Sequence, residues 1–359
     1  MPAGMLRNRR LLLGHSFKSN NNRICEGKPF RGMNMNKNKN KKPFLWVFAL
    51  IMSMAVMGVG CSMESPAGAV EETGSAAKSG EQLKIGMAFQ EMNNPYFISM
   101  REAFEEAAAA IGAETIVADA QHDINKQTND IDDMIQKGID ILLINPADSA
   151  GAETAVLAAK KAGVIVVAID AQANGPIDSF VGSKNYDAGY KAGQKMAEDL
   201  KGKGNVAILD GIPVVPILER VQGFKDAIAE YPDIKLVDTQ NGNQDRAKAM
   251  AVTENMLQSN PDLQAIFSVN DGGALGSYAA IEASGRDVWL YSVDGHPEVV
   301  EAIVKGGVFK ATVAQFPRDQ VRIGLGMALA KYWGASVVPA SVPIDVKLLT
   351  KENAEGFSW

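Results

Sequence analysis

Short apolar runs recur along the chain, and many of them stop at an amide or carboxylate side chain. Most are followed by a turn and then by a helical pattern. This alternation predicts an α/β fold with parallel strands, in which ligands bind outside the carboxyl ends of the strands. The polar residues that end the runs are Gln90, Asn145, Asp170, Asn270, Asp294 and Gln315. Such a row favours a small, neutral, hydroxyl-rich ligand, because a phosphate needs Gly-rich loops, Lys and Arg.

Ten of these runs are predicted as strands, because continuous Val, Ile, Leu and Ala runs are typical of parallel strands buried on both faces. The strands are expected at 83–89, 115–120, 141–145, 164–169, 179–182, 205–210, 234–239, 265–269, 288–293 and 309–315. Helices are expected at 95–111, 123–137, 149–162, 186–200, 217–230, 244–258, 273–284 and 297–305. Ten strands are more than one compact sheet of this type usually carries, so two doubly wound, Rossmann-like domains are predicted.

A weak internal repeat supports two similar domains. ILLINPADSAGAETAVLAAKKAG and AIFSVNDGGALGSYAAIEASG share an apolar run, an Asn, a small-residue helix and a closing Gly. One copy lies in each half of the chain. From this repeat we expect Asn145 and Asn270 to face each other across a cleft between the domains.

The N-terminal segment differs from the rest of the chain in charge. Residues 1–60 hold 11 Lys and Arg against one acid, and they end in an uncharged run before Cys61. A basic region, a short apolar run and small residues before a Cys indicate a bacterial lipoprotein signal peptide. We expect lipidation at Cys61, with residues 61–82 as its flexible tether. The alternative is an uncleaved membrane helix, and Met33 or Met35 is the more natural start.

The composition of the remaining chain argues against several classes of function. Residues 61–359 carry 41 acids against 25 basic residues, which disfavours nucleic acid as a partner. The chain contains neither a P-loop motif nor GxSxG, and His122 and His296 lack a metal-ligand spacing, so we expect them in turns or at helix starts. Asp170 and Asp294 could serve as general acid and base, but we favour them as acceptors for ligand hydroxyls. No enzyme activity, cofactor or metal is predicted.

The segment FQEMNNPYFISM, residues 89–100, places two aromatic residues directly after a strand end. Asn94 and Pro95 begin a helix, with Pro at a tolerated first-turn position. Tyr96 and Phe97 follow, and an aromatic face at a cleft can stack on the C–H face of a sugar. Because consecutive helical residues point about 100° apart, we expect one ring in the site and the other partly in the core.

Several motifs together resemble the ribose-binding-protein family, the type I periplasmic solute-binding proteins of bacterial sugar ABC transporters. They are NNPYF, LLINPADS, the strand end at Asp170, ER-x-x-GF at 219–224, VND-x-x-ALG at 269–276, VDG-x-P at 293–297 and ATVAQFP at 311–317. They occur in order between about residues 83 and 349. The resemblance implies two domains joined by a three-segment hinge that closes on the ligand.

The resemblance also implies domain boundaries and ligand contacts. The N-terminal lobe would comprise residues 83–183 and 316–345, and the C-terminal lobe residues 184–315 and 346–359. The expected ligand-binding residues are Gln90, Asn94, Tyr96, Phe97, Asn145, Asp170, Gln244, Asn270, Asp294 and Gln315.

Three positions depart from the ribose pattern. Ala171 and Leu218 stand where the family has arginines, and Gln244 stands where it has an aromatic residue. Arg220 remains, and we expect it to brace its helix against a loop. Buried hydroxyls without partners are penalised, so the sequence favours another monosaccharide, a polyol or a less hydroxylated ligand over ribose.

The sequence therefore predicts a monomeric, lipid-anchored solute-binding protein on the outer face of the cell membrane. The resemblance implies that it presents a carbohydrate-like ligand to an ABC permease served by a separate ATPase. One alternative is a sensor subunit that hands a sugar or quorum signal to a chemoreceptor or sensor kinase. A sugar-responsive repressor is disfavoured. Such a protein needs a DNA-binding helix-turn-helix at its N-terminus, where this chain has a predicted signal peptide and tether.

Overall fold

Two six-stranded sheets form the framework of the protein. The computed structural model describes residues 82–359, and Cys61 with the rest of the predicted signal and tether lies outside them. The described residues belong to one compact unit. We call each sheet with its helices a lobe, lobe A for the sheet that holds the first strand and lobe B for the other.

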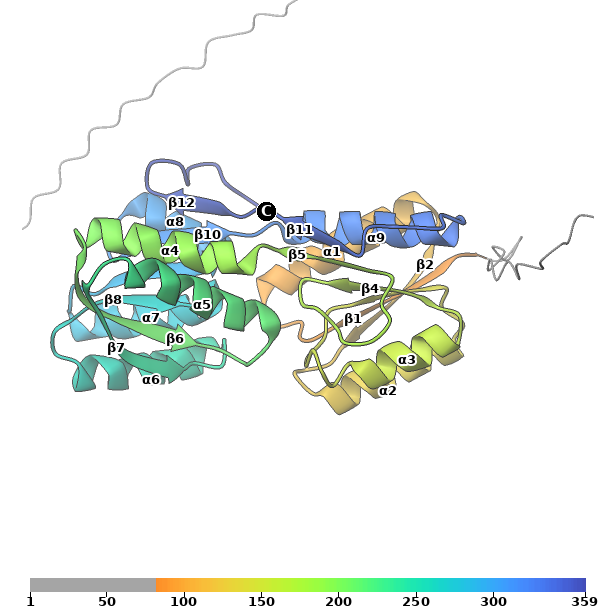
Figure 1. The fold of residues 1–359 in the computed structure, drawn as a ribbon, viewed down its shortest axis with the longest axis horizontal. Coiled ribbons are helices and arrows are strands. Elements are labelled where there is room, and N and C mark those ends of the chain that lie inside the picture. Colours follow the sequence, from red (N-terminus) through yellow and green to blue (C-terminus); the bar gives the residue numbers. More distant parts are fainter. Residues whose placement is uncertain (1–81) are drawn as a thin grey trace, which may run out of the picture. The chain divides into compact units, whose positions relative to one another are not determined.

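Lobe A has the strand order β11-β5-β4-β3-β1-β2, and all five strand pairs are parallel. Its strands are β1 (Lys84–Phe89), β2 (Glu114–Asp119), β3 (Ile141–Ile144), β4 (Ile165–Ile169), β5 (Ser179–Ser183) and β11 (Ser341–Ile344). Its helices are α1 (Pro95–Ala110), α2 (Ile124–Gln136), α3 (Glu153–Lys161) and α9 (Pro317–Tyr332). Helices α1 and α9 cover one face of the sheet, and α2 and α3 cover the other, with an apolar core between each helix layer and the sheet (Figure 1).

Lobe B repeats this plan with the order β12-β10-β9-β8-β6-β7, in which only the β10–β12 pair is antiparallel. Its strands are β6 (Lys203–Asp210), β7 (Asp233–Asn241), β8 (Leu263–Ser268), β9 (Trp289–Asp294), β10 (Phe309–Ala314) and β12 (Lys347–Thr350). Its helices are α4 (Asn185–Asp199), α5 (Val215–Ala229), α6 (Arg246–Ser259), α7 (Asp271–Ser284) and α8 (Pro297–Lys305). Helices α4 and α5 pack on one face, and α6, α7 and α8 pack on the other.

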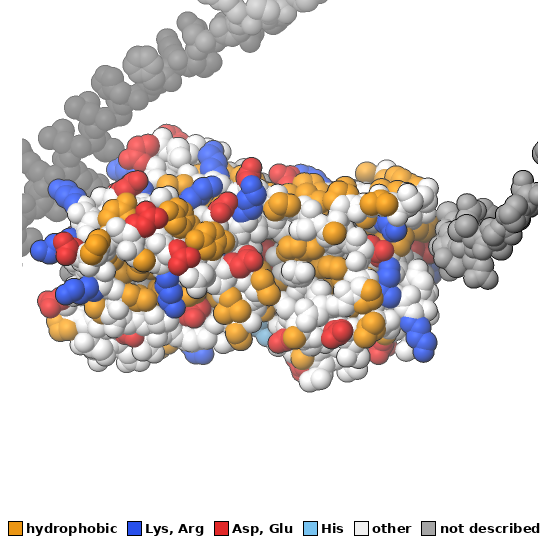
Figure 2. All heavy atoms as spheres, viewed as in Figure 1, with side chains coloured by type: hydrophobic (Ala, Val, Ile, Leu, Met, Phe, Trp, Pro, Cys, Tyr) orange, Lys and Arg blue, Asp and Glu red, His pale blue; other side chains and the backbone are white. Residues whose placement is uncertain are grey.

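The chain passes between the lobes three times, after β5, after β10 and after β11. The predicted α/β class with two doubly wound sheets is confirmed, and each of the ten predicted strands and eight predicted helices has a counterpart. The prediction missed α9, β11 and β12. On the face shown in Figure 2, basic and acidic side chains are interspersed over both lobes.

None of the helices in residues 82–359 is long and apolar enough to cross a membrane. The same residues contain no group of three or more His, Cys, Asp or Glu that could hold a metal ion.

Candidate functional site

A cavity lies between the two lobes at the carboxyl ends of their strands. The space open to a water-sized molecule inside it is about 30 Å³, so the side chains of the two lobes nearly fill it. Lobe A lines it with the turn after β1, the start of α1 and the end of β4. Lobe B adds the start of α5 and the ends of β8 and β9. The lining residues are Gln90, Asn94, Tyr96, Phe97, Asp170, Ala171, Val214, Pro216, Ile217, Arg220, Gln244, Asn270, Asp294 and Gln315.

In lobe A, the start of α1 fixes an aromatic ring against a carboxylate. The Asn94 side chain caps the helix by accepting from the backbone N–H of Tyr96 at 3.0 Å. The Tyr96 hydroxyl donates to Asp170 Oδ1 at 2.9 Å and accepts from Gln320 Nε2 at 2.9 Å. Burial, and then the charge of Asp170, raise the pKa of the Tyr96 hydroxyl, which keeps it a donor.

Asn145 supports this arrangement from behind the cavity. It is fully buried and does not line the cavity. Its Nδ2 donates to Asp170 Oδ2 at 3.2 Å, and its Oδ1 accepts from the backbone N–H of Gln90 at 3.2 Å. The expectation that Asn145 faces Asn270 across the cleft is therefore wrong, because its hydrogen bonds are made within lobe A.

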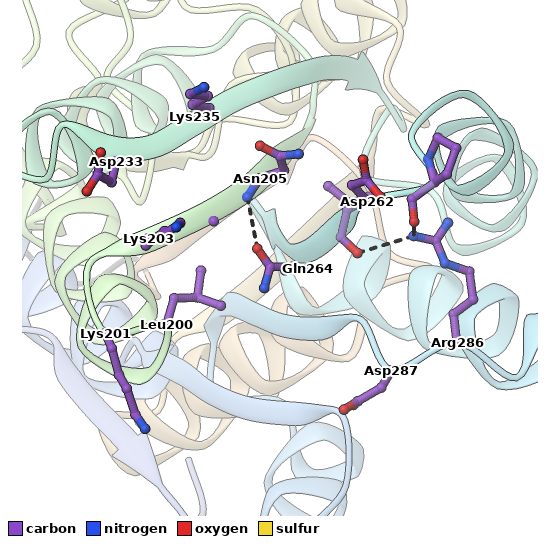
Figure 3. Close-up of a pocket in the computed structure, with 13 residues that line it drawn as sticks. Leu200, Lys201, Lys203, Asn205, Asp233, Lys235, Asp262, Gln264, Arg286 and Asp287 are labelled. Atoms are coloured by element: carbon purple, nitrogen blue, oxygen red, sulfur yellow. Dashed lines mark hydrogen bonds between the residues drawn. The ribbon is translucent and has the colours of Figure 1, made fainter.

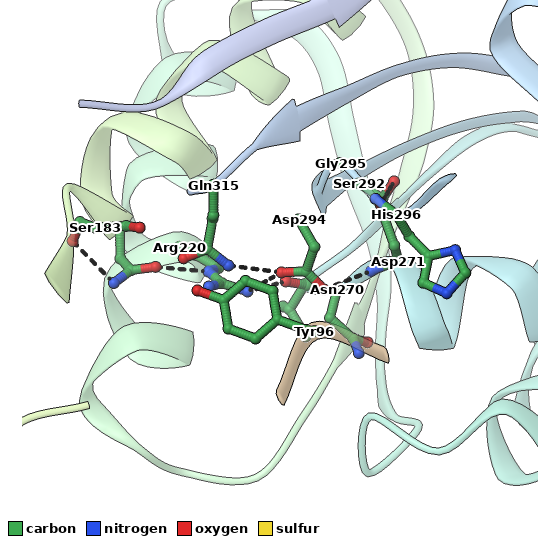
Figure 4. A network of polar contacts seen from close by, with 12 residues as sticks. Tyr96, Ser183, Arg220, Asn270, Asp271, Ser292, Asp294, Gly295, His296 and Gln315 are labelled. Carbon is green, nitrogen blue, oxygen red and sulfur yellow. Dashed lines mark hydrogen bonds and ion pairs between the residues drawn. The ribbon is translucent and has the colours of Figure 1, made fainter. Parts of the chain in front are cut away.

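In lobe B, Asp294 is held by three donors (Figure 4). Gln315 Nε2 donates to its Oδ1 at 2.7 Å, and Arg220 Nη1 lies 3.4 Å from the same oxygen. The backbone N–H of Asp271 donates to its Oδ2 at 3.3 Å. Asp294 also has a φ of 141°, a region that non-glycine residues rarely adopt and that marks strain held by the surrounding structure.

Arg220 is more than the brace expected from the sequence. Its Nε donates to Asn185 Oδ1 and its Nη1 to the backbone carbonyl of Val269, both at 2.8 Å. These bonds do hold α5 against neighbouring segments. The guanidinium also lines the cavity and pairs with Asp294. The ER-x-x-GF motif placed the residue on a helix but gave no direction for its side chain.

Asp271 forms a support beneath Asp294. It is fully buried at the start of α7. Its carboxylate accepts from the hydroxyls of Ser292 on β9 and Thr312 on β10, the latter at 2.8 Å, and from the backbone N–H of His296 at 2.7 Å. It thereby ties α7 to two strands and to the loop that follows Asp294 (Figure 4). Sequence reasoning missed it because it lies one residue beyond Asn270, the polar residue taken as the end of the apolar run.

Burial raises the pKa of each carboxyl at this site. For Asp170 and Asp294 the neighbouring Arg220 opposes the rise, whereas for Asp271 the charge of Asp294 adds to it. A ligand hydroxyl that donates to Asp170 or Asp294 would favour the ionised form.

Three buried polar atoms in the cavity have no hydrogen-bond partner. They are Gln90 Oε1, Asn270 Nδ2 and Gln315 Oε1, among five such side-chain atoms in residues 82–359. All three residues are at most 5% exposed. A buried polar atom without a partner costs about 1–3 kcal/mol. Two acceptors and one donor are therefore available to a molecule in this cavity.

Nine of the ten expected ligand-binding residues line the cavity, and Asn145 stands behind it. Tyr96 and Phe97 both line it and both pack into the lobe A core, so they do not divide these roles as expected. The sequence analysis did not single out Val214, Pro216 and Ile217, because an apolar turn before a helix has no special signature.

His122 and His296 lie beside this cavity. They line a neighbouring cavity that shares Asn94 and Gln244 with the first. His296 caps α8 by accepting from the backbone N–H of Glu298, and His122 sits in a turn with a φ of 62°. These are the turn and helix-start roles predicted for them.

A larger cavity of lobe B lies near the amino ends of its strands (Figure 3). Residues at the starts of β6, β7 and β8 line it, together with Arg286. The Arg286 guanidinium donates to four backbone carbonyls, those of Leu257, Asn260, Pro261 and Leu263. Ligands in α/β sheets bind at the opposite, carboxyl ends, so the cavity between the lobes is the better candidate.

Comparisons with known proteins identify the family of the chain. A family model described as a periplasmic binding protein domain matches residues 85–334. The ribose import binding protein of Bacillus subtilis is 39% identical over 259 residues, covering 72% of this chain and 83% of that protein. A D-apiose import binding protein from Paraburkholderia graminis is 32% identical over 268 residues, covering 73% and 85%.

Solved structures show the same fold with small polyhydroxylated molecules bound. A solute-binding protein from Actinobacillus succinogenes with bound D-allose gives a TM-score of 0.73 at 32% identity, over 77% of this chain and all of that one. One from Bacillus halodurans with bound myo-inositol gives 0.72 at 28%, over 76% and 96%. The chain therefore belongs to the periplasmic binding protein domain family.

Proposed function

We propose that this protein is the extracytoplasmic solute-binding component of an ABC importer. It captures a monosaccharide or a similar polyhydroxylated molecule in the cavity between lobes A and B. The observation that carries this proposal is the set of three unpartnered polar atoms on Gln90, Asn270 and Gln315, all buried in the cavity between the lobes. Ligand hydroxyls can donate to the two amide oxygens and accept from the amide nitrogen.

Binding is coupled to hinge closure, because each lobe supplies only part of the lining. Lobe A contributes Asp170 and Tyr96, and lobe B contributes Asn270 and Asp294. The three crossings between the lobes form the hinge. A ligand that contacts both lobes binds the closed arrangement more tightly than the open one. This difference in affinity sets how far the ligand shifts the protein towards the closed arrangement.

Each polar residue has a distinct role in this proposal. Asp170 and Asp294 accept hydrogen bonds from ligand hydroxyls, and Tyr96 and Phe97 provide the apolar surface for a ring. The Gln244 side chain accepts from the backbone N–H of Ile212 through Oε1, so its Nε2 is available to donate to the ligand. No bond of the ligand is made or broken. The liganded form is delivered to a permease with a separate ATPase, while a lipid at Cys61 holds the protein at the membrane.

The test is thermal unfolding of the purified protein with pentoses, hexoses, polyols and nucleosides. A ligand at a hundred times its Kd adds about 2.7 kcal/mol of stability. We expect such a shift with at least one sugar or polyol, and its loss in Asp170→Asn. The exposed Asp132→Asn on α2 is the matched control and should keep the full shift. A folded protein that no compound stabilises would refute the proposal.

A further inference from the structure

Part of the cavity wall is apolar. The start of α5 contributes Val214, Pro216 and Ile217, and lobe A adds Ala171. The exposed fractions of Val214, Ile217 and Ala171 are 6%, 2% and 2%. We call these four residues the apolar wall.

The local structure fixes the apolar wall in place. Val214 stands in extended conformation immediately before α5, and Pro216 occupies the first turn, where its missing N–H costs nothing. Val214 and Ile217 also belong to the lobe B core, so neither side chain is free to turn away. Val215 and Leu218, on the same turn, are instead exposed by 38% and 55%.

The polar atoms of the cavity that lack a partner lie on elements other than α5. The unpartnered atoms belong to Gln90, Asn270 and Gln315. The one cationic side chain of the lining, Arg220, already donates to Asn185, Val269 and Asp294. The apolar wall offers no side-chain donor or acceptor.

The free-energy balance at the apolar wall opposes a hydroxyl group. A hydroxyl buried there would lose its bonds to water without replacement, whereas a methyl or methylene group would be removed from water favourably. Discrimination of this kind amounts to about 10- to 100-fold in affinity for one group in an apolar pocket.

We infer that the ligand is a deoxy sugar or deoxy polyol, with a methyl or methylene group directed at the apolar wall where a common sugar carries a hydroxyl. This inference rests on the proposed function and names the substrate class of the same site. The other hydroxyls remain for Asp170, Asp294 and the three unpartnered amide atoms.

Matched sugar pairs test the inference by calorimetric titration. Each pair has one stereochemistry and differs in one hydroxyl: 5-deoxyribose and ribose, D-fucose and D-galactose, L-rhamnose and L-mannose. In the series that binds, we expect the deoxy member to bind about 10- to 100-fold more tightly. Equal or tighter binding of the hydroxylated member overturns the inference and leaves the proposed function standing. Failure of all six sugars overturns the inference, and the broader thermal panel then decides the proposed function separately.

Variants of the apolar wall provide the second arm. Val214→Thr keeps the shape of the side chain and places a hydroxyl at the wall, so the deoxy preference should fall at least fivefold. Val215→Thr makes the same change one residue away on the exposed side and should leave the preference unchanged. Ile217→Thr repeats the test at a second wall position, in case Val214→Thr folds poorly. A preference that survives both wall substitutions contradicts the inference.

Discussion

The ion pair between Arg220 and Asp294 gives a prediction that does not require the ligand to be known. Both side chains are buried, with exposed fractions of 4% and 8%. Replacing Arg220 by Met keeps most of the apolar stem but removes the donors to Asn185, Val269 and Asp294. The Asp294 carboxylate is then left buried with the charge of Asp170 nearby.

The expected loss is large, because breaking one side of a buried pair costs about 3–5 kcal/mol. For a protein of this size, each kcal/mol lowers Tm by roughly 2 °C or slightly more. We therefore expect Arg220→Met to unfold roughly 6–10 °C below the wild type at pH 8. Arg101→Met removes an exposed guanidinium from an i,i+4 pair on α1 and should change Tm by about 1 °C or less.

The pH dependence identifies the electrostatic part of the loss. Burial raises the pKa of Asp294 to about 6 even with Arg220 opposing it, and loss of Arg220 raises that pKa further. A carboxyl with a raised folded-state pKa is destabilising when ionised, and this cost disappears as pH falls and the group takes up a proton. The deficit of Arg220→Met should therefore be smaller at pH 5 than at pH 8.

Adding Asp294→Asn to Arg220→Met should recover part of the lost stability, because the buried charge is gone. Thermal unfolding followed by circular dichroism at both pH values measures all three proteins. A deficit below 2 °C at pH 8 would refute the reasoning. A large deficit that does not change with pH would assign the loss to the bonds with Asn185 and Val269 rather than to the ion pair.

Three further predictions follow from the same site. Ligand affinity should weaken as pH falls below about 6, because a protonated Asp294 accepts fewer bonds from ligand hydroxyls, and titration calorimetry at pH 5 and 7.5 measures this. Trp359 donates from Nε1 to the Asp294 carbonyl and packs on Tyr96, so its fluorescence should change on binding, and Trp359→Phe should weaken affinity several-fold. Asp271→Asn should lower stability by about 1–3 kcal/mol in denaturant unfolding, because the amide cannot accept all three bonds of the carboxylate.

Each of these has an outcome that contradicts it. A pH-independent affinity would mean that Asp294 does not accept from the ligand. A fluorescence change that persists in Trp359→Phe would come from another tryptophan and would contradict the assignment. Trp333→Phe is the control, because Trp333 is 68% exposed. Asp271→Asn with unchanged stability would remove the proposed support beneath Asp294.

The elements that the sequence failed to predict depend on distant parts of the chain. Helix α9 contains Gly324, which weakens a helix in isolation, but a Cβ there would lie 2.1 Å from Ile169 Cδ1. The glycine lets Ile169 of β4 pack closely against the helix, which no local pattern reveals. Strand β11 has only four residues and contains Pro343, which an edge strand tolerates; it pairs with β5, far away in the sequence.

What the sequence determined by itself is the α/β class and the edge of the sheets that carries the site. Apolar runs that stop at polar residues place Gln90, Asp170 and Asp294 at strand ends, and strand ends meet at one edge because parallel strands share a direction. The order of apolar and polar residues along a strand is a local property of the sequence, so it can be recognised without the tertiary structure.

Only the tertiary structure decided how the side chains at this edge divide their roles. It turned Asn145 inward to hold Asp170, aimed Arg220 at Asp294, and set Val214 and Ile217 in the cavity wall. The direction of a side chain depends on how its helix or strand is rotated against elements from elsewhere in the chain. The site itself exists only where two lobes, built from interleaved segments, approach each other.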